Sequence, residues 1–530
     1  MTIPSLDEAH RATDLAAAVV AAGVARVAEL GDEHQVVAYD VAHAAAAVAA
    51  CRSMLGYGAT GPDQTMLATA FVADAIHEIA ACVLGREAAW GTDPAILADA
   101  MPFVATGRSA EFLRRVADIG AGPRDLDDDF ALVAATFRRF ADDRIRPVAE
   151  KVHRTNGDVP EEVIGGLAGL GGFGLSVPEE YGGFAAGDER DHLGMVVATE
   201  ELSRGSLGIG GSLVTRPEIL TRALLAGGTE AQKRRWLPRI AAGDVMVAVA
   251  VTEPDHGSDV AGIRTAARPG PDGGWIISGT KTWCTFAGRA DVLMLLARTD
   301  PDSTDHRGLS LFVIEKPRSS GHAFDENQAA DDRPGRGRMQ GRAIDTIGYR
   351  GMHSFEISFE DWWVPADGLV GEAAGEGRGF YLQMEGFENG RLQTAARAVG
   401  LMQAAYESAA EYAANRVVFG RPVADYELTK AKLARMAYLI QGGRQFALSV
   451  AHDMGRGEGQ LGAAMVKANV GRAAEWVTRE AMQIHGGMGY AEEYDVSRYF
   501  VDARVLSIFE GADETLCLKV IIRRLVAARG

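Results

Sequence analysis

The sequence predicts a mainly α-helical protein with a central β domain, and the spacing of its apolar residues is the reason. Over residues 1–244 and 373–530, apolar residues recur at intervals of three and four, as on one face of an amphipathic helix. Between these parts the pattern changes to short runs of β-branched and large apolar residues, bounded by Gly, Pro and Asp. Such runs indicate the strands of a small barrel or sandwich. The runs are residues 245–251, 274–278, 292–297, 309–314 and 355–359.

The composition of the 530 residues excludes some classes of function. The formal net charge of −18 argues against a surface that binds nucleic acid. The four cysteines are far apart and lack metal-ligand spacing, so we expect reduced thiols in a reducing compartment. The first residues are acidic where a signal peptide would be basic, and apolar runs such as 16–22 are too short to span a bilayer. We therefore expect a cytoplasmic protein with no nucleic-acid or membrane partner.

Residues 1–122 are rich in alanine and are predicted to form an accessory helical domain. Two long amphipathic segments, 36–55 and 62–84, are separated by the turn-rich residues 56–61. Pro, Gly and an acidic cluster at 121–129 mark the end of this domain, ahead of a new helix with Asp at its start.

Two patterns in the helical parts could be taken for ligand sites, and both are better explained without a ligand. His43, Asp74 and His77 lie on the first helices, but helical histidines are more often solvated or hydrogen-bonded than metal ligands, so no metal site is predicted. Residues 169–174 spell G-x-G-x-x-G, the dinucleotide-binding fingerprint. That fingerprint requires a strand before it and a helix after it, whereas here a helical pattern precedes it, so these glycines are interpreted as a turn.

The remaining residues divide into three predicted domains, which are a helical domain at 123–244, a β domain at 245–372 and a helix bundle at 373–530. Arg391 and Arg416 bracket the first predicted helix of the bundle. Two apolar stripes with three- and four-residue spacing are assigned to the bundle core. The first is Leu392, Ala395, Val399, Met402, Tyr406, Ala409 and Ala413; the second is Val466, Val470, Ala473, Val477, Ala481 and Ile484.

Two segments of the β domain offer groups that suit a flat, polar ligand. Residues 251–260 place hydroxyls and a glycine at a strand end, where backbone amides can meet carbonyl or phosphate oxygens. Residues 279–288 are expected to form a loop in which Trp283 lies beside hydroxyl donors, an arrangement that suits one face of a planar heterocycle. As isolated turns, each segment could equally be structural.

Residues 501–515 contain the strongest candidate for chemistry. The apolar run 505–509 leads to one carboxylate, Glu510, which Gly511 follows at once. A glycine there can adopt backbone angles that other residues avoid, and it lets a flat ligand lie close to the main chain. A carboxylate held between apolar segments is removed from water, which suits a group that takes a proton at neutral pH. A solvated loop glutamate is the alternative on this stretch alone.

Six dispersed motifs resemble one family, the flavin-dependent acyl-CoA dehydrogenases, over about residues 127–530. They occur in the order in which the family has them, which makes the resemblance specific. It implies an N-terminal helical domain, a middle β domain and a C-terminal four-helix bundle that builds oligomers, with FAD as the cofactor. The motifs are Val-Pro-Glu-Glu-Tyr-Gly-Gly (177–183), Val-Thr-Glu-Pro-Asp-His-Gly-Ser-Asp (251–259), Gly-Thr-Lys-Thr-Trp-Cys-Thr (279–285), Arg-Val-Val-Phe-Gly (416–420), Gln-Ile-His-Gly-Gly-Met-Gly (483–489) and Ile-Phe-Glu-Gly (508–511).

The resemblance implies that Glu510 removes the α-proton of an acyl-CoA thioester while the β-hydrogen leaves as hydride to the flavin. Some members place the base on the helix around Arg391, but the corresponding residue here is Gly390, which strengthens the assignment to Glu510. Glu388 and Arg391 are assigned to contacts with the CoA arm. The backbone amide of Glu510 and a flavin ribityl hydroxyl would bind the thioester oxygen, and Gly511 would lie against the substrate.

The resemblance also implies which residues bind FAD, and in two places the sequence departs from the family. Tyr426-Glu427 stands where many members have an aromatic residue or His followed by Gln, and Ala512-Asp-Glu514 replaces a more usual Thr-Ser-Gln. The matching residues fall into three groups. Val251, Thr252, Gly257 and Ser258 match the flavin loop, where Ser258 also faces the CoA arm; Trp283 and Thr285 match groups along the isoalloxazine ring; Arg416, Phe419, Gln483, Gly486 and Gly487 match positions that reach FAD across a dimer interface.

The residues before about 125 are diagnostic because most members of the family start near that point. This extension, with residues 42–48 and 71–75, is similar to that of (2S)-methylsuccinyl-CoA dehydrogenases, which make mesaconyl-CoA in the ethylmalonyl-CoA pathway. Residues 349–352 resemble the same subgroup. Such a substrate carries a free carboxylate beside the reacting carbons, so the acyl pocket should contain a cation. Arg216 falls on the helix that lines this pocket in the family and is assigned to the carboxylate, with a plain surface arginine as the alternative.

The resemblance implies an acyl-CoA substrate, an electron-transfer flavoprotein as the electron acceptor, and a homodimer or homotetramer. Two other functions are considered. One is an acyl-CoA dehydrogenase of other short or branched chains, or an oxidase or monooxygenase on the same fold. The other, from a different class, is a catalytically silent flavoprotein that binds DNA or a protein partner, against which the acidic charge and the intact Glu510 argue.

Overall fold

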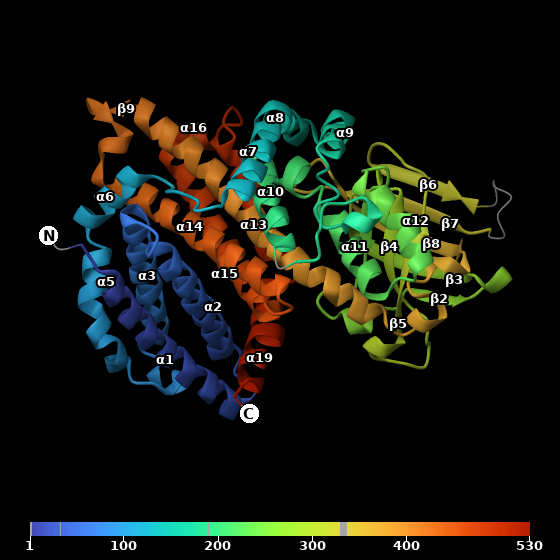
Figure 1. Cartoon of the computed structure of the whole chain (residues 1–530), viewed down its shortest axis with the longest axis horizontal. Coiled ribbons are helices and arrows are strands. Elements are labelled where there is room, and N and C mark those ends of the chain that lie inside the picture. Colours follow the sequence, from blue (N-terminus) through green and yellow to red (C-terminus); the bar gives the residue numbers. More distant parts are fainter. Residues whose placement is uncertain (1–2, 32, 189, 329–335, 530) are drawn as a thin grey trace. The chain divides into compact units, whose positions relative to one another are not determined.

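The computed structural model describes residues 3–31, 33–188, 190–328 and 336–529, and it divides into two compact units. Unit 1 consists of Met1–Thr136 and Arg391–Gly530, and unit 2 consists of Phe137–Gly390. The boundaries fall inside helices α7 (Asp128–Phe140) and α13 (Gly379–Asn415) (Figure 1). Most of the described chain is helical and one large sheet lies in unit 2, which confirms the predicted mainly α protein with a central β domain.

The N-terminal part of unit 1 is a set of helices, as predicted. The helices expected at 36–55 and 62–84 are α2 and α3, although α2 continues through part of the predicted turn at 56–61. The first helix begins with a capping box, in which Ser5 and Glu8 exchange hydrogen bonds and satisfy the free amides of the first turn. The elements are α1 (Leu6–Leu30), α2 (Gln35–Gly58), α3 (Pro62–Val83), α4 (Glu87–Trp90), η1 (Pro94–Ala100), α5 (Met101–Gly107) and α6 (Ala110–Ile119).

The C-terminal part of unit 1 is a bundle built on three long helices. Most residues of the two predicted apolar stripes are buried, as core positions should be. The prediction that Arg391 opens the first of these helices is wrong, since α13 begins at Gly379 and Arg391 lies inside it. The elements after α13 are β9 (Val417–Val418), β10 (Arg421–Pro422), η11 (Val423–Asp425), α14 (Glu427–Gly455), α15 (Gln460–His485), α16 (Gly487–Tyr490), α17 (Val496–Arg504), η12 (Val505–Ser507), α18 (Asp513–Thr515), η13 (Leu516–Ile521) and α19 (Ile522–Ala527).

Within unit 1, the N-terminal helices pack on the bundle, as the blue and orange ribbons in Figure 1 show. Gly442 on α14 leaves no room for a side chain, because a Cβ there would lie 2.2 Å from the ring of Phe71 on α3. Asp74, also on α3, accepts a hydrogen bond of 2.9 Å from Arg435 on α14. Apolar packing and a buried ion pair therefore join the accessory helices to the bundle.

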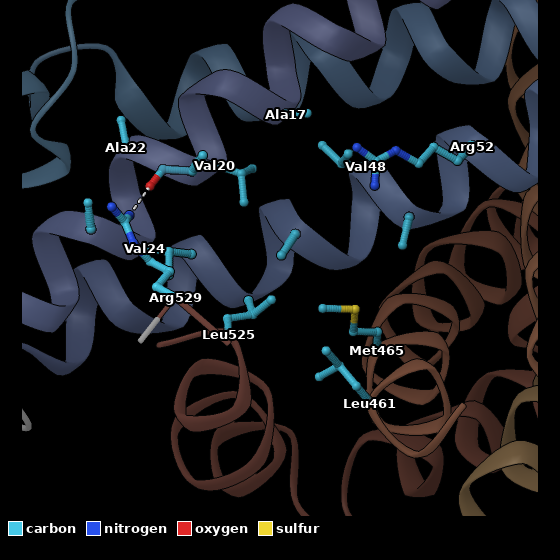
Figure 2. A pocket seen from close by; sticks show the side chains of 14 residues that line it. Ala17, Val20, Ala22, Val24, Val48, Arg52, Leu461, Met465, Leu525 and Arg529 are labelled. Atoms are coloured by element: carbon cyan, nitrogen blue, oxygen red, sulfur yellow. Dashed lines mark hydrogen bonds between the residues drawn. The ribbon is translucent and has the colours of Figure 1, made fainter. Parts of the chain in front are cut away.

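A groove of about 700 Å³ lies between α1, α2 and the ends of the bundle helices (Figure 2). Its lining is mostly small and apolar, and Arg529 closes one side by donating a hydrogen bond of 2.8 Å to the carbonyl of Ala21. The last residues of the chain are thus tied to the first helix. The lining residues are Ala17, Val20, Ala21, Ala22, Val24, Ala25, Ala45, Val48, Ala49, Arg52, Leu461, Met465, Leu525 and Arg529.

One helix among the described residues, α3, is long and apolar enough to cross a membrane by length and composition. It is an exception to the expectation that the apolar runs are short. Its 18-residue window has a mean hydropathy of 1.6, and 61% of that window is buried inside the protein. A buried core helix passes the same test, and α3 packs against α1, α2 and α14 in that way.

The first half of unit 2 is helical, and the glycines at 169–174 begin at the last residue of helix α9, which agrees with the expectation that a helix precedes them. No strand precedes them in the described part of this segment. The elements are η2 (Ala141–Ile145), α8 (Arg146–Thr155), α9 (Glu161–Gly169), η3 (Glu179–Tyr181), α10 (Asp191–Gly205), η4 (Leu207–Gly211), α11 (Thr215–Gly227) and α12 (Glu230–Ala241).

The second half of unit 2 is an eight-stranded sheet in the order β1-β4-β2-β3-β8-β7-β6, with β5 paired to β4. The β1–β4 and β2–β4 pairs are parallel, and the other pairs are antiparallel. All five predicted strands are present, while β2, β6 and β7 were missed because they are short or largely exposed. The strands are β1 (Val247–Ala250), β2 (Ala266–Pro269), β3 (Trp275–Thr285), β4 (Val292–Arg298), β5 (Leu309–Glu315), β6 (Ala323–Asn327), β7 (Arg338–Ile344) and β8 (Ser354–Val364).

The predicted loop at 279–288 is wrong, because β3 continues through most of it to Thr285. Its polar sequence hides the strand, whose pairing with β8 shifts register between Ile277 and Gly279 and again between Lys281 and Cys284. Bulges of this kind keep a strand in the sheet while they redirect individual side chains.

The close contact between the accessory helices and the bundle predicts the effect of one added methyl group. Gly442→Ala should lower the free energy of unfolding by about 1–3 kcal/mol, because the new Cβ overlaps the buried Phe71 ring. Gly56→Ala on α2 is the matched control, since a Cβ there meets open space, and it should be neutral or stabilising. Thermal and denaturant unfolding of the two variants checks this, and equal effects would contradict the packing.

Candidate active site

Glu510 and Gly511 form a strained turn in unit 1 between η12 and α18. The backbone φ is +54° at Glu510 and +101° at Gly511, so two consecutive residues lie in the region that L side chains rarely adopt. The prediction that Gly511 needs unusual backbone angles is confirmed. A Cβ at Gly511 would also lie 2.9 Å from a methyl carbon of Leu516. The backbone angle and this contact both favour glycine directly after the carboxylate.

The Glu510 side chain is 8% exposed and lies beside a fully buried cation. The Nη2 atom of Arg397 on α13 is 3.8 Å from Glu510 Oε1, and the guanidinium stacks over the ring of Phe509 at 4.6 Å. The same Nη2 donates a hydrogen bond of 2.7 Å to Thr394. This contact places an opposite charge beside the Glu510 carboxylate. Arg397 was assigned to no site from the sequence, because nothing near it in the chain indicates a carboxylate partner.

Lys467 on α15 is a second buried cation at the turn. It is 0% exposed, and its amine donates a hydrogen bond to the carbonyl of Gly511. The pKa of Lys467 is lowered to about 8, chiefly by burial and to a smaller extent by the charge of Arg391, which together outweigh the opposite effects of Asp513 and Glu510. The residue was assigned to no site from the sequence, because a lysine on a helix is usually solvated.

Asp513 lies just beyond the turn and contacts the N-terminal helix α2. Its Oδ2 atom accepts a hydrogen bond of 2.5 Å from the Tyr39 hydroxyl and is 2.9 Å from Nε2 of His43. His43 therefore meets Asp513 and not the other two residues that were considered with it from the sequence. Of those two, Asp74 pairs with Arg435.

Helix α13 carries two buried amides whose polar atoms have no hydrogen-bond partner among the described residues. They belong to Gln383 and Gln393, which are 0% and 2% exposed. Buried polar atoms are normally satisfied, so each of these amides is a candidate contact for a polar ligand, Gln383 in unit 2 and Gln393 in unit 1. The predicted CoA contacts Glu388 and Arg391 lie between them on the same helix and are half-buried.

Arg416, Phe419, Gln483, Gly486 and Gly487, the predicted contacts across a dimer interface, are all exposed on unit 1. The ends of α13 and α15 meet there, because the rings of Tyr412 and His485 stack with centroids 4.3 Å apart. Large apolar side chains also face solvent at this end: Phe419 is 95% exposed and Tyr490 is 85% exposed. An exposed cluster of this kind is typical of a surface that another molecule covers.

In unit 2, a buried ion pair fixes the segment 251–258. Lys281 on β3 is fully buried and donates hydrogen bonds of 2.8 Å to Glu253 and 2.9 Å to the carbonyl of Val251. Burial raises the pKa of Glu253, but Lys281 and the amides of Arg264 and Thr265 outweigh this and lower it. Burial lowers the pKa of Lys281 against the pull of Glu253. The pair thus holds the segment against the sheet, and Thr252, Gly257 and Ser258 remain at or near its surface.

The predicted ring contacts lie on β3, next to this segment. The Thr282 amide donates a 2.8 Å hydrogen bond to the Thr252 carbonyl, so the two stretches are directly joined. Trp283 has a φ of +57° and its side chain is 54% exposed, which leaves the indole available to a flat ligand. Thr285 is buried, and its hydroxyl is 2.9 Å from that of Ser354. This face of unit 2 fits a flavin, because it offers the exposed Trp283 indole, nearby threonine hydroxyls and space around Gly257.

Arg216 is buried on α11, and it is not the plain surface arginine that was considered as the alternative. Its Nη1 atom donates hydrogen bonds of 3.0 Å to the Tyr349 hydroxyl and 3.5 Å to the Ser212 carbonyl. Two residues further on, Glu218 is also buried; burial raises its pKa to about 7 although Arg222 lies 3.6 Å away. The helix therefore brings a buried guanidinium to the Tyr349 segment that was singled out from the sequence.

Three consecutive stretches of the chain match the domains of one enzyme family. Residues 127–244 match the acyl-CoA dehydrogenase N-terminal domain, 248–362 the middle domain and 377–526 the C-terminal domain. The chain is 43% identical to the (2S)-methylsuccinyl-CoA dehydrogenase of Cereibacter sphaeroides over 406 aligned residues. The alignment covers 76% of this chain and 71% of that relative. The chain belongs to the acyl-CoA dehydrogenase family.

Solved structures agree with this assignment. The butyryl-CoA dehydrogenase of Megasphaera elsdenii has a TM-score of 0.68 and 30% identity, and the match covers 76% of this chain and 99% of that one. A glutaryl-coenzyme A dehydrogenase in complex with glutaryl-CoA has a TM-score of 0.66 and 30% identity, with 75% and 95% covered. This acyl-CoA dehydrogenase family member is therefore an FAD-dependent oxidoreductase, and its helices α1–α6 form an extension before the family's domains.

The buried amine beside the turn makes the stability of the protein depend on pH. The unfolded lysine has a pKa of about 10.4, so between pH 8 and that value the unfolded chain binds the proton that the folded chain has released. The wild type should therefore gain stability relative to Lys467→Met as the pH rises, by at most about 1.4 kcal/mol per pH unit. Denaturant unfolding of both proteins at pH 7.5, 8.5 and 9.5 measures the difference, and a constant difference contradicts the lowered pKa.

Proposed function

We propose that this family member dehydrogenates (2S)-methylsuccinyl-CoA to mesaconyl-CoA, with Glu510 as the base that removes the α-proton. The observation that carries the reaction is the Glu510–Gly511 turn, which presents a largely buried carboxylate beside the Arg397 guanidinium from a left-handed backbone conformation. General bases at such positions contribute about 10²–10⁴ in rate. FAD supplies the acceptor for the β-hydrogen, which leaves as hydride.

The groups around Glu510 have distinct tasks in this proposal. Arg397 orients the Glu510 carboxylate through their charged contact, and its stacking on Phe509 fixes the guanidinium. Lys467 holds the Gly511 carbonyl and thereby the shape of the turn. The Glu510 amide donates to the thioester oxygen, where negative charge develops as the α-proton leaves. Glu388 and Arg391 bind the CoA arm, and Gly511 leaves room for the acyl group.

FAD is assigned to the residues of unit 2 that form its open face and to the exposed end of the bundle. The segment fixed by Glu253 and Lys281 provides hydroxyl and amide donors, and Trp283 covers one face of the ring system. The exposed residues at the ends of α13 and α15 are proposed to reach FAD in a second copy of the chain, so a homodimer or homotetramer is the proposed assembly. The FAD-binding residues are Val251, Thr252, Gly257, Ser258, Trp283, Thr285, Arg416, Phe419, Gln483, Gly486 and Gly487.

The proposed substrate rests on the 43% identical relative and on Arg216. A methylsuccinyl group carries a carboxylate, and a buried guanidinium can bind it through charged hydrogen bonds worth about 1.5–3 kcal/mol. Tyr349 holds Arg216 in place at 3.0 Å. We further propose an electron-transfer flavoprotein as the electron acceptor and a cytoplasmic location, both of which rest on the sequence resemblance and composition.

Replacing the proposed base tests the reaction. Glu510→Gln should lower the rate of anaerobic flavin bleaching by at least about a hundredfold, because an amide cannot accept the α-proton. The measurement mixes the purified protein with a panel of acyl-CoA thioesters that includes (2S)-methylsuccinyl-CoA, butyryl-CoA and isovaleryl-CoA. Glu514→Gln, an exposed carboxylate four residues away, should bleach at the wild-type rate. The proposal is wrong if the protein purifies without flavin or if Glu510→Gln bleaches at the wild-type rate. Steady oxygen consumption with substrate would instead identify an oxidase.

Arg216→Ala tests the substrate. It should lower kcat/KM for (2S)-methylsuccinyl-CoA about ten- to hundredfold and leave butyryl-CoA, which lacks the second carboxylate, nearly unchanged. Tyr349→Phe removes only the hydroxyl that accepts from Arg216, so it should act in the same direction with a smaller effect. Equal losses on both substrates would refute the assignment of Arg216 to the carboxylate.

A further inference from the structure

The turn that carries Glu510 runs directly into a contact with the N-terminal extension. Asp513 follows Glu510 by three residues, and its side chain is 9% exposed. Tyr39 and His43, which both bond its Oδ2 atom, are four residues apart on α2 and so lie on the same face of that helix. The extension therefore meets the catalytic segment through two polar contacts on one carboxylate oxygen.

These polar groups form one connected cluster. The rings of Tyr39 and His43 pack edge to face with centroids 4.7 Å apart, and His43 Nε2 is also 3.4 Å from the thiol of Cys517, one turn after Asp513. Burial raises the pKa of Asp513, but His43, Tyr39 and the charge of Lys467 outweigh this and lower it. Burial and the neighbouring Asp513 raise the pKa of Tyr39. The carboxylate is thus ionised and the Tyr39 hydroxyl is its donor.

The cluster holds the chain directly after the strained turn, and other contacts hold the residues around it. Ser507 ties the chain before Glu510 to α15 through a 2.5 Å hydrogen bond to Glu475, and Lys467 ties the Gly511 carbonyl to the same helix. Only Gly511 and Ala512 separate Glu510 from Asp513, and a left-handed glutamate costs about 1–2 kcal/mol relative to relaxed backbone. A fixed Asp513 prevents these two linking residues from relaxing the turn.

We propose that Tyr39 and His43 are positioning residues for Glu510, acting through Asp513, so that the N-terminal extension is part of the catalytic apparatus. The inference rests on the proposed role of Glu510 as the base. It links the chain's two unusual features, because Asp513 belongs to the Ala512-Asp-Glu514 departure and its two partners belong to the extension.

The same cluster contains the residue types of a metal site, since His43, Asp513 and Cys517 offer ligand atoms within 4.8 Å of one another. Two observations favour the hydrogen-bonded network. Burial and the charge of Asp513 raise the pKa of the Cys517 thiol, whereas a metal needs the thiolate. The Lys467 charge beside Asp513 also opposes a divalent cation.

Tyr39→Phe tests the proposal, and Tyr57→Phe is its matched control. Both variants delete one α2 hydroxyl that makes a part-buried hydrogen bond; that of Tyr57 donates 2.8 Å to the Pro123 carbonyl and lies outside the cluster. With (2S)-methylsuccinyl-CoA and butyryl-CoA and ferrocenium as acceptor, Tyr39→Phe should lower kcat per bound flavin at least about tenfold and leave KM within about threefold. Tyr57→Phe should lower the unfolding midpoint and leave kcat within about twofold.

A second variant and a direct measure of the turn make the outcome decisive. His43→Gln should lower kcat in the same way, and the double variant Tyr39→Phe/Asp513→Asn should lose no more than the worse single variant, because both act through one contact. Hydrogen–deuterium exchange should rise in peptides covering 510–517 in Tyr39→Phe but not in Tyr57→Phe. Wild-type kcat and exchange in Tyr39→Phe and His43→Gln overturn the inference. If Glu510→Gln abolishes turnover at the same time, the proposed function stands and only the positioning role fails.

Discussion

The structure of the segment proposed to carry the base depends on holding two consecutive residues, Glu510 and Gly511, at positive φ. Such a turn is not stable by itself, because the chain would gain free energy by relaxing the glutamate. It persists where neighbouring groups hold it in place. Here Arg397 contacts Glu510 and stacks on Phe509, Lys467 binds the Gly511 carbonyl, and Asp513 anchors the residues that follow. These contacts can be understood as restraints on this backbone.

Those restraints are charged, and their balance explains why they can be buried. Arg397 and Lys467 are fully buried cations, and Glu510 and Asp513 are the carboxylates beside them. An isolated buried charge costs several kcal/mol, so each member of this set depends on the others. Unit 2 uses the same device on a smaller scale, where the buried Glu253–Lys281 pair fixes the segment assigned to FAD. In both units, buried charge pairs give a loop one conformation, which apolar packing alone specifies less strictly.

The sequence was sufficient for the parts that follow from local pattern. The three- and four-residue spacing of apolar residues predicted α2, α3 and the bundle stripes, because a helix that buries one face repeats apolar residues at that spacing. The end of β3 was taken for a loop because its inward-facing polar residues, such as Lys281, break the alternation that marks a strand. The contact between Tyr39 and Asp513 spans 474 positions and joins two residue types that are usually solvated, so no local pattern could indicate it. Arg397 was missed for a related reason, since its charge is meaningful only beside Glu510.

The N-terminal extension and the altered residues after Gly511 depend on each other, because Asp513 and its partners on α2 need one another. An aspartate at 513 would be a liability without partners, because burying its carboxylate carries a desolvation cost of several kcal/mol. Helix α2 offsets that cost with a phenol and an imidazole on one face, while Lys467 supplies the opposite charge. Conversely, Tyr39 and His43 on α2 would lose their shared hydrogen-bond partner if a neutral, shorter side chain stood at 513. The two features therefore stabilise each other, and a chain that lost either one would leave polar groups without these partners next to Glu510.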